Sequence, residues 1–189
     1  RTKAEGDWQT DAKDVLSFWF EDHGFDEWFA GGEEFDRKCE TYLADIHAKA
    51  VRSELWQWRQ TAEGRVAEII LLDQLSRQLH RGEAAAFSSD TMALALAQEL
   101  VYTPAFETLD EDRRLFALMP FQHAESLVVQ EESVRLYAKY GSAEIQEYAI
   151  GHRDTIARFG RFPMRNAALG RTSTPEEIAY MAEREGKAY

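Results

Sequence analysis

Residues 66–82 read VAEIILLDQLSRQLHRG, and their apolar side chains recur with the spacing of a helix. Asp73, Arg77 and Arg81 follow one another at four-residue intervals, which aligns them as a polar stripe along one face. The other faces of this stretch carry Leu71, Leu72, Leu75 and Leu79. The pattern predicts a mostly buried helix over residues 61–80, with Asp73 and Arg77 correctly spaced for an ion pair within it.

Helical periodicity also marks most of the remaining chain. We expect further helices near residues 11–20, 33–52, 88–102, 110–118, 120–140, 144–159 and 174–185, and we find no convincing alternating strand. Thr174, Pro175 and Glu177 make a capping box, while Gly160 is typical of a helix end. Because the loops are short and no linker is visible, we predict one compact all-α domain over residues 1–189, an array of helical hairpins whose residues 1–10 are flexible.

The composition excludes several classes of protein. With 189 residues and 44% hydrophobic residues, the chain is long and apolar enough to bury a core. A net charge of −12 argues against nucleic acids and anionic membrane surfaces as partners, because both require a broad basic face. Neither a membrane-spanning run nor a signal peptide is visible in the sequence as given.

The single cysteine favours a reducing compartment, so we expect a cytoplasmic protein. Cys39 lies in a helical pattern, where a buried side chain is the simpler interpretation than a nucleophile. We see no phosphate-binding glycine loop and no dinucleotide motif, and no two histidines are four residues apart on a helix. The sequence therefore predicts no cofactor and no metal.

Positive charge is concentrated near the C-terminus. Residues 152–171, HRDTIARFGRFPMRNAALGR, carry five arginines against one acid, whereas the whole chain has 22 basic and 34 acidic residues. Guanidinium keeps its proton and needs acceptors, and its fork suits a carboxylate or a phosphate. Two interpretations stay open: a network of ion pairs within the fold, such as Asp154 with Arg158, or a site for an anion.

Polar residues interrupt the apolar faces of three predicted helices. His123 and Gln130 share a face of residues 120–140, and His152 interrupts a face of residues 144–159. Such groups cost about 1–3 kcal/mol each when they are buried without partners, so we expect them to meet. They form either a buried network that fixes helix register or a polar pocket between helices.

In the second interpretation the pocket holds a small anionic ligand. The candidate ligand-binding residues come from the polar stripe, the interrupted faces and the arginine-rich segment: Asp73, Arg77, Gln130, Arg158, Arg161, Arg165, Asn166 and Arg171. As an alternative, the chain is an enzyme without a cofactor, in which His123 or His152 acts as general base and Glu125 or Asp73 orients it.

A third hypothesis concerns the aromatic N-terminal region. Trp19, Trp28 and Trp56 would line a groove for a partner helix or peptide, and the same aromatic end is a candidate surface for a homodimer. The competing interpretation is a packed aromatic cluster that closes one end of the core, which is what aromatic side chains mostly do.

Six motifs together resemble a bacterial family of uncharacterised proteins, domain-of-unknown-function family 924. They are FWF (18–20), LLDQLSRQLHRG (71–82), AFSSD (86–90), MPFQHAES (119–126), HRDTIARFGRFPMRN (152–166) and LGRTSTPEE (169–177). The likeness extends from about Val15 to Met181. Ser76 and Met164 depart from the family pattern, in which proline or histidine is often found.

The resemblance implies a fold more than a function. It implies a tetratricopeptide-like helical arrangement, although this chain shows no repeat of about 34 residues. The positions that characterise the family fall here on Asp73, Gln74, Arg77, His123, Glu125, Gln130, His152, Arg158, Arg161, Arg165, Asn166 and Arg171. The resemblance implies no established activity for them.

Overall fold

The computed structural model describes residues 7–185, and within that range it contains helices and no strand, which confirms the all-α prediction. The finer expectation of a tetratricopeptide-like arrangement stays a prediction. Of the residues expected to be flexible, 1–6 lie outside the described range, whereas Trp8 to Thr10 form the first turn of a helix.

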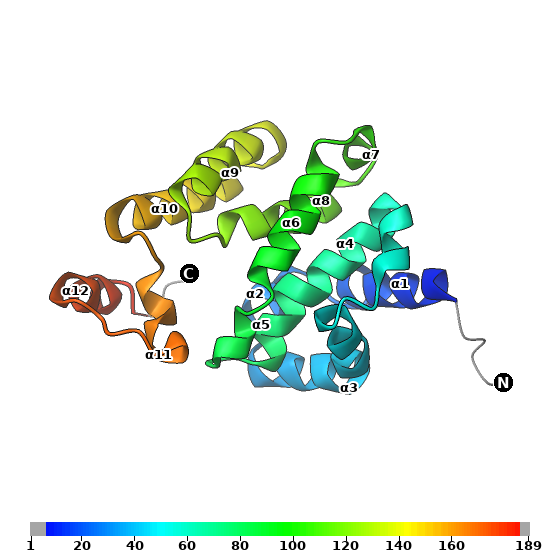
Figure 1. Ribbon diagram of the computed structural model, residues 1–189, viewed down its shortest axis with the longest axis horizontal. Coiled ribbons are helices and arrows are strands. Elements are labelled where there is room, and N and C mark those ends of the chain that lie inside the picture. The colour runs from blue at the N-terminus through cyan, green and yellow to red at the C-terminus, as the bar shows by residue number, and fades with distance from the viewer. Residues whose placement is uncertain (1–6, 186–189) are drawn as a thin grey trace. The chain divides into compact units, whose positions relative to one another are not determined.

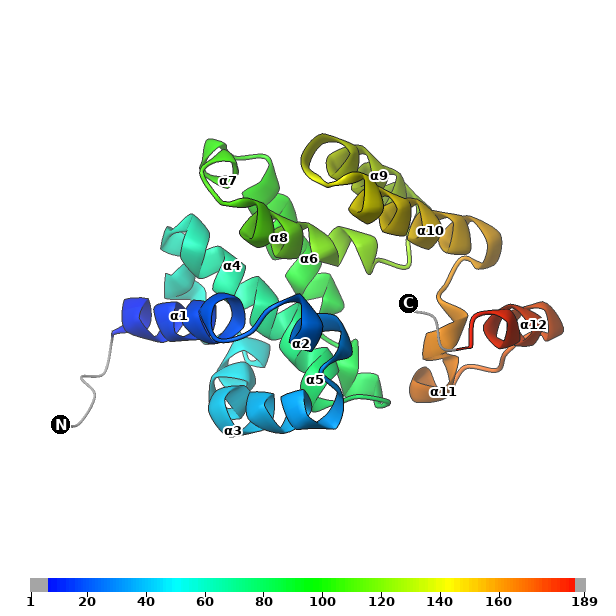
Figure 2. The same ribbon diagram turned by 180° about the vertical axis from the view of Figure 1, so that it is seen from behind.

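The α-helices are α1 (Trp8–Leu16), α2 (Phe25–Ala30), α3 (Gly32–Val51), α4 (Ala62–Ile70), α5 (Ser76–Leu79), α6 (Asp90–Val101), α7 (Pro104–Glu107), α8 (Glu111–Gln122), α9 (Leu127–Tyr140), α10 (Ala143–Phe159), α11 (Asn166–Leu169) and α12 (Pro175–Glu183) (Figures 1 and 2). Two segments are π-helical, η1 (Ser17–Glu21) and η3 (Leu71–Leu75). Three are 3₁₀-helical, η2 (Trp56–Gln60), η4 (Ala84–Ala86) and η5 (Pro163–Arg165).

The internal contacts divide the chain into two compact units. Within the described range, the first unit comprises residues 7–81 and 85–120, and the second comprises residues 82–84 and 121–185. The prediction of a single domain stays a prediction, and each unit is described by itself.

The core of the first unit is built on the helical run predicted from residues 61–80. This run is the succession of α4, η3 and α5 without a break, begun by a Thr61 side chain that accepts a hydrogen bond from the Gly64 amide. Leu71, Leu72 and Leu75 are completely buried, and each such side chain stabilises the fold by about 1.5–3 kcal/mol. α3 packs along η3 and α5, while α1 and α6 pack against α4.

The aromatic residues of the first unit form a packed cluster. Trp19 is 0% exposed and Trp28 4% exposed, and their rings stack with centroids 6.0 Å apart. The prediction that these two tryptophans line an open groove is therefore wrong, because burial of their large rings inside the core is the more stabilising arrangement. Trp56 is 63% exposed and does not join them.

The second unit is built on a pair of neighbouring helices, α9 and α10, which Figures 1 and 2 both show side by side. The Ser126 and Ser142 side chains cap their first turns by accepting from backbone amides three residues later. α10 ends at Gly160, whose φ of 72° lies in the left-handed region that glycine adopts without strain. The predicted capping box at Thr174 begins α12, which packs against η5.

The prediction of one helix over residues 120–140 is wrong. α8 continues through Pro120 to Gln122, and a new helix starts at Leu127. Pro120 lacks an amide hydrogen and normally disfavours a helix interior, but Leu118 and Met119 immediately before it are buried. Tertiary packing thus overrides the local signal, and His123 lies in the loop between the two helices.

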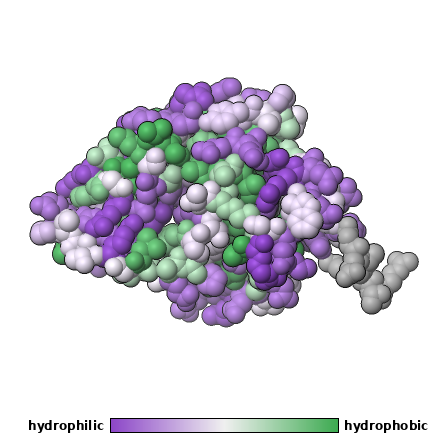
Figure 3. All heavy atoms as spheres, in the orientation of Figure 1, coloured by the Kyte–Doolittle hydropathy of each residue, from purple (hydrophilic) through white to green (hydrophobic). Residues whose placement is uncertain are grey.

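Hydrophilic and hydrophobic residues are interspersed over the face of the chain drawn in Figure 3. Among the described helices, none has the length and apolar character that crossing a bilayer requires.

Candidate functional site

The arginine-rich segment connects α10 to α12 through two short helices. Gly160 ends α10, Pro163 opens η5, and Gly170 ends α11 with a φ of 65°. This path places Arg161, Arg165 and Arg171 in loops and short helical turns, and their long side chains contact other parts of the second unit. Two buried or half-buried carboxylates, Glu125 and Glu177, receive them.

Arg161 binds Glu177 with both prongs of its guanidinium. Its Nε lies 2.9 Å from Oε2 and its Nη2 lies 2.8 Å from Oε1, and Nη2 also donates to the Thr172 carbonyl at 2.8 Å. The hydrogen bond from Arg161, followed by that from the Thr174 amide, lowers the pKa of Glu177 to about 2. Arg161 therefore holds an anion that belongs to the protein itself.

Glu125 is the second acceptor and has several donors. Arg171 binds it with Nη1 to Oε1 at 2.9 Å and Nη2 to Oε2 at 3.1 Å, and the Phe162 amide donates to Oε2 at 2.6 Å. Burial raises the pKa of this carboxyl, but these hydrogen bonds outweigh it and hold the pKa below its ordinary value. Arg171 also donates to Asn166 Oδ1 at 2.9 Å and to the Phe162 carbonyl at 3.0 Å.

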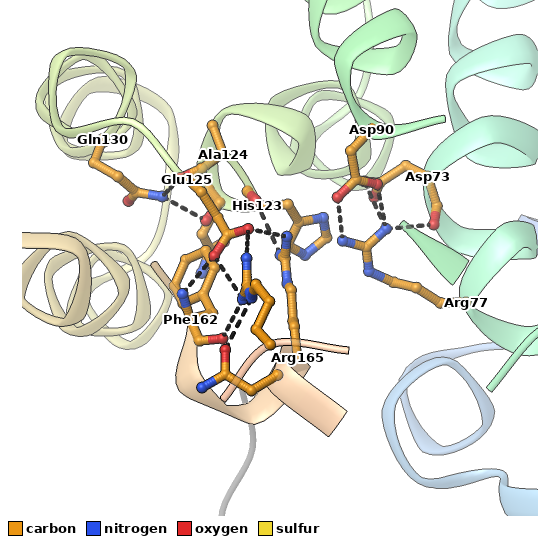
Figure 4. Close-up of polar contacts among 12 residues, drawn as sticks. Asp73, Arg77, Asp90, His123, Ala124, Glu125, Gln130, Phe162 and Arg165 are labelled. Atoms are coloured by element: carbon orange, nitrogen blue, oxygen red, sulfur yellow. Dashed lines mark hydrogen bonds and ion pairs between the residues drawn. The ribbon is translucent and has the colours of Figure 1, made fainter. Parts of the chain in front are cut away.

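Arg165 faces the same carboxylate from a greater distance. Its Nη1 lies 4.0 Å from Glu125 Oε1, while its Nη2 donates to the His123 carbonyl at 2.9 Å. The guanidinium carbon stands 4.6 Å from the centre of the Phe162 ring. Figure 4 shows Arg165 beside Glu125 and Phe162. Two guanidinium groups thus share one carboxylate, and Arg171 makes the closer contact with it.

The two histidines predicted to meet lie close together. The ring centroids of His123 and His152 are 6.5 Å apart, and the edge of the Phe162 ring faces His152 at 5.6 Å. His152 is 8% exposed and its Nδ1 contacts the Tyr148 carbonyl oxygen at 2.7 Å. Burial is the main cause that lowers the pKa of His152 to about 3, electrostatic interactions with His123, Arg165 and Arg184 act in the same direction, and the hydrogen bond to the Tyr148 carbonyl opposes them. The ring is neutral at pH 7.

Gln130 and Asn166 have structural partners. The amide nitrogen of Gln130 donates to the carbonyls of Gln122 and Ala124, both at 2.8 Å, which satisfies carbonyl groups left open at the end of α8. Asn166 joins Arg171 to the Ser173 hydroxyl, which lies 3.0 Å from its Nδ2. Both side chains therefore hold loops in place, whether or not they also meet a ligand.

Arg158 is arranged differently from the other arginines of its segment. It is exposed, with its guanidinium 4.6 Å from the Phe159 ring centre and 5.7 Å from that of Tyr180. The expected ion pair with Asp154 is wrong, because Asp154 accepts instead from Nε of Arg153 at 2.8 Å. No ion pair joins Arg158 to a carboxylate among residues 7–185.

Asp73 and Arg77, the other predicted site residues, lie in the first unit. Arg77 binds Asp90 at 2.8 and 2.9 Å and reaches Asp73 Oδ1 at 3.4 Å, which confirms the predicted intrahelical pair (Figure 4). Asp73 is 1% exposed, and its Oδ2 also accepts a hydrogen bond from the side-chain Nε2 of Gln74 at 2.8 Å. Within this unit, Arg77 is thus a link between two carboxylates.

Three further observations on the described residues concern metal binding, the reactivity of Cys39 and a hollow on the surface. No group of three or more histidine, cysteine, aspartate or glutamate side chains in residues 7–185 is arranged to hold a metal ion. Burial raises the pKa of Cys39 to about 12, so its thiol is not a nucleophile at neutral pH. A hollow of about 370 Å³ beside α1 is lined by residues such as Lys13 and Arg113, and none of its lining residues is among the predicted site residues.

Sequence reasoning missed Arg184, whose positive charge acts on His152. It also missed Phe162 as a backbone donor to Glu125, and Asp90 as the main partner of Arg77. Arg184 follows a regular amphipathic helix, so nothing in its local pattern distinguishes it. The AFSSD motif includes Asp90, but spacing alone does not indicate that Arg77 is its partner.

Comparisons with known proteins give a consistent result. Residues 15–185 match the family model described as "Bacterial protein of unknown function (DUF924)". A solved structure of ATU0120, a protein of unknown function from Agrobacterium tumefaciens, is 37% identical and superposes with a TM-score of 0.88. The match covers 94% of this chain and 99% of that one. No curated protein matches the chain.

Proposed function

The chain belongs to DUF924, a bacterial family of unknown function, and we propose that its second unit binds a small anion beside Arg165, Arg184 and the two histidines. The anionic group is a phosphate or a carboxylate. Arg161 and Arg171, which we had expected to contact the ligand, are left out of this set because each already holds a carboxylate of the protein with both prongs.

The sharing of Glu125 is the observation that carries the proposal. Arg171 uses both oxygens of this carboxylate, while Arg165 stands 4.0 Å from one of them. The positive charges of Arg165 and Arg171 thus converge on a single carboxylate. A small oxyanion would be attracted by this excess of positive charge, and guanidinium suits the oxygens of a phosphate or a carboxylate.

The surroundings of His152 provide the second support. Burial is the main reason that the ring is neutral, and the positive charges of Arg165 and Arg184 also disfavour its protonation. Positive potential at a largely buried point attracts anions more strongly than it would in bulk water. A small anion near this ring would be attracted by these two guanidinium groups.

The proposal of anion binding has more support than the hypothesis that His152 acts as a general base. An effective general base has a pKa near the working pH, and burial lowers that of His152 to about 3. Glu125, the proposed orienting carboxylate, is hydrogen-bonded to Arg171 and the Phe162 amide. The enzyme hypothesis stays a prediction, without an observation that favours it over binding.

Isothermal titration calorimetry with phosphate, sulfate and acetate tests the proposal. Thermal shifts alone are inadequate, because phosphate and sulfate stabilise most proteins by exclusion from the surface. We expect a saturable heat for at least one anion, and a loss of affinity of about tenfold or more in Arg165→Gln.

The matched control is Arg153→Gln. Arg153 belongs to the same arginine-rich segment but pairs with Asp154 and Glu131 on exposed surface. Its loss should leave the titration unchanged. An absence of saturable heat with all three anions, or equal affinities in both variants, would contradict the proposal.

A further inference from the structure

Two aromatic side chains lie exposed on one face of α2, the short helix that precedes α3 (Figure 2). Phe25 is 53% exposed and Phe29 is 56% exposed, and their ring centroids are 5.9 Å apart. Phe25 also contacts the ring of the buried Trp28 at 5.1 Å, and Phe29 stacks on the buried Phe116 at 6.3 Å. The core thus holds both rings in place, while more than half of each residue remains open to a partner.

The chain around these two rings is acidic. Residues 14–36 contain eight aspartates and glutamates and neither a lysine nor an arginine. Glu21, Asp22 and Asp26 are exposed, and no ion pair joins them to another residue in the described part of the chain. Exposed apolar rings therefore lie next to carboxylates whose charge the protein itself does not offset.

The first turn of α3 adds further negative charge. The side chains of Glu33 and Glu34 are 95% and 78% exposed. Their partners, Arg37 and Lys38, stand 3.9 Å away from them. Ion pairs at such exposed positions hold their members weakly, so these two carboxylates stay accessible to a competing cation.

The aromatic cluster of the first unit already holds one cation on the face of a ring. The guanidinium carbon of Arg113 lies 4.6 Å from the centre of the Phe20 ring, which in turn contacts Trp28 at 5.8 Å. A cation over an aromatic ring is attracted by the negative face of its π system. Arg113 is itself paired with Asp110, so an additional cation at the exposed rings has to come from another molecule.

These features discriminate between kinds of partner. A second copy of the chain would bring the same carboxylates against one another, and like charges placed across an interface disfavour it. Nucleic acids and anionic lipid surfaces are repelled for the same reason. A basic protein segment is attracted, because its lysines or arginines meet carboxylates and ring faces while its apolar side chains cover the two phenylalanines.

We propose that Phe25 and Phe29, together with Asp22 and Asp26, form a docking surface for a lysine- or arginine-rich segment of another protein. The apolar side chains of that segment pack on the two rings, and its cationic groups pair with the carboxylates. The surface belongs to the first unit, so it is independent of the anion binding proposed for the second.

Fluorescence anisotropy of a labelled peptide tests this surface on the full chain at low and constant ionic strength. The probe has seven residues, with two lysines at each end and three leucines between them. We expect saturable binding that Phe29→Ser and Phe25→Ser each weaken at least about fivefold, because aromatic anchors carry much of the energy of an interface. Both positions are more than half exposed, so both variants should fold. Trp56→Ser, at a 63% exposed aromatic residue of η2, is the control and should bind the probe as wild type does.

A double variant tests the role of charge. Asp22→Asn combined with Asp26→Asn should weaken binding about threefold or more and reduce its dependence on salt. The control combines Glu176→Gln with Glu183→Gln, which removes the same charge from exposed positions of α12, and it should leave the affinity nearly unchanged.

Several outcomes would overturn the proposal. They are the absence of binding, equal affinities in Phe29→Ser and Trp56→Ser, and equal effects of the two double variants. Equal binding of a peptide with glutamates in place of the lysines, or with serines in place of the leucines, would do the same, since one half of the recognition would then be missing. Sedimentation velocity examines the remaining occupant: a wild-type dimer that Phe29→Ser dissociates would show that a second copy covers the rings instead.

Discussion

Arg161 and Glu177 form a two-pronged ion pair that joins the turn after α10 to the first turn of α12, with nitrogen–oxygen distances of 2.9 and 2.8 Å. The same carboxylate accepts from the Thr174 amide at 2.9 Å, which completes the capping box. A single acidic side chain thus fixes both the start of a helix and the position of an arginine.

Removing the charge of Glu177 should destabilise the protein. Glu177→Gln keeps the shape of the side chain but leaves Arg161 without its carboxylate, so we expect a lower melting temperature by calorimetry. Glu176→Gln, at the exposed neighbouring position, is the control and should change little. Equal melting temperatures for the two variants would show that the ion pair contributes nothing.

The lowered pKa of the Glu177 carboxyl implies that the stability of the protein depends on pH. Its pKa falls from an ordinary 4.5 to about 2 in the folded protein. A lowered pKa means that the unfolded chain binds the proton first, so the stabilisation is present above pH 4.5 and is lost as the pH falls toward 2. Urea unfolding of wild type and Glu177→Gln should therefore differ at pH 6 and converge near pH 2. A difference that stays constant over this range would contradict the assignment.

Gln130 should matter for stability because its amide satisfies carbonyls of Gln122 and Ala124. We expect Gln130→Ala to lower the free energy of unfolding by about 1–3 kcal/mol, the cost of leaving buried polar groups without partners. Val128→Ala, at a side chain that is 83% exposed, provides the control on the same helix. Chemical denaturation measures both. A loss no greater than that of the control would refute the capping role.

Cys39 should be inert in the folded protein. Its side chain is 0% exposed and burial raises its pKa to about 12, so little reactive thiolate is present at pH 8. We expect a thiol reagent to modify it only at the rate at which the protein unfolds, and rapidly in denaturant. Fast modification of native protein would show that this region of the core opens readily.

Much of the fold could be predicted from sequence because its signals are local and agree with one another. The run from Ala62 to Leu79 has helical periodicity throughout, and the cap at Thr174 and the stop at Gly160 depend only on adjacent residues. The prediction failed at Pro120, where a proline typical of a helix start lies instead inside α8. Burial of the residues before it depends on distant parts of the chain, which local patterns do not encode.

The candidate site could be predicted only as a set of residues. The charge count singled out the arginine-rich segment, because cations in an acidic chain need acceptors, and the interrupted apolar faces singled out the two histidines. These sequence signals do not indicate which arginine binds which carboxylate. Glu125 and Arg171 are 46 residues apart, and the assignment of Arg171 to Glu125 and Arg161 to Glu177 depends on how the loops fold.

The most direct test of the central claim is the NMR signal of the Arg165 guanidinium, assigned by its absence from Arg165→Gln, during a titration of the wild-type protein with phosphate at constant ionic strength. The account predicts a saturable shift of the Arg165 Nε–H resonance, with the Arg153 resonance unchanged. If the two resonances move together in proportion to salt, or if neither moves, the second unit does not bind the anion at Arg165.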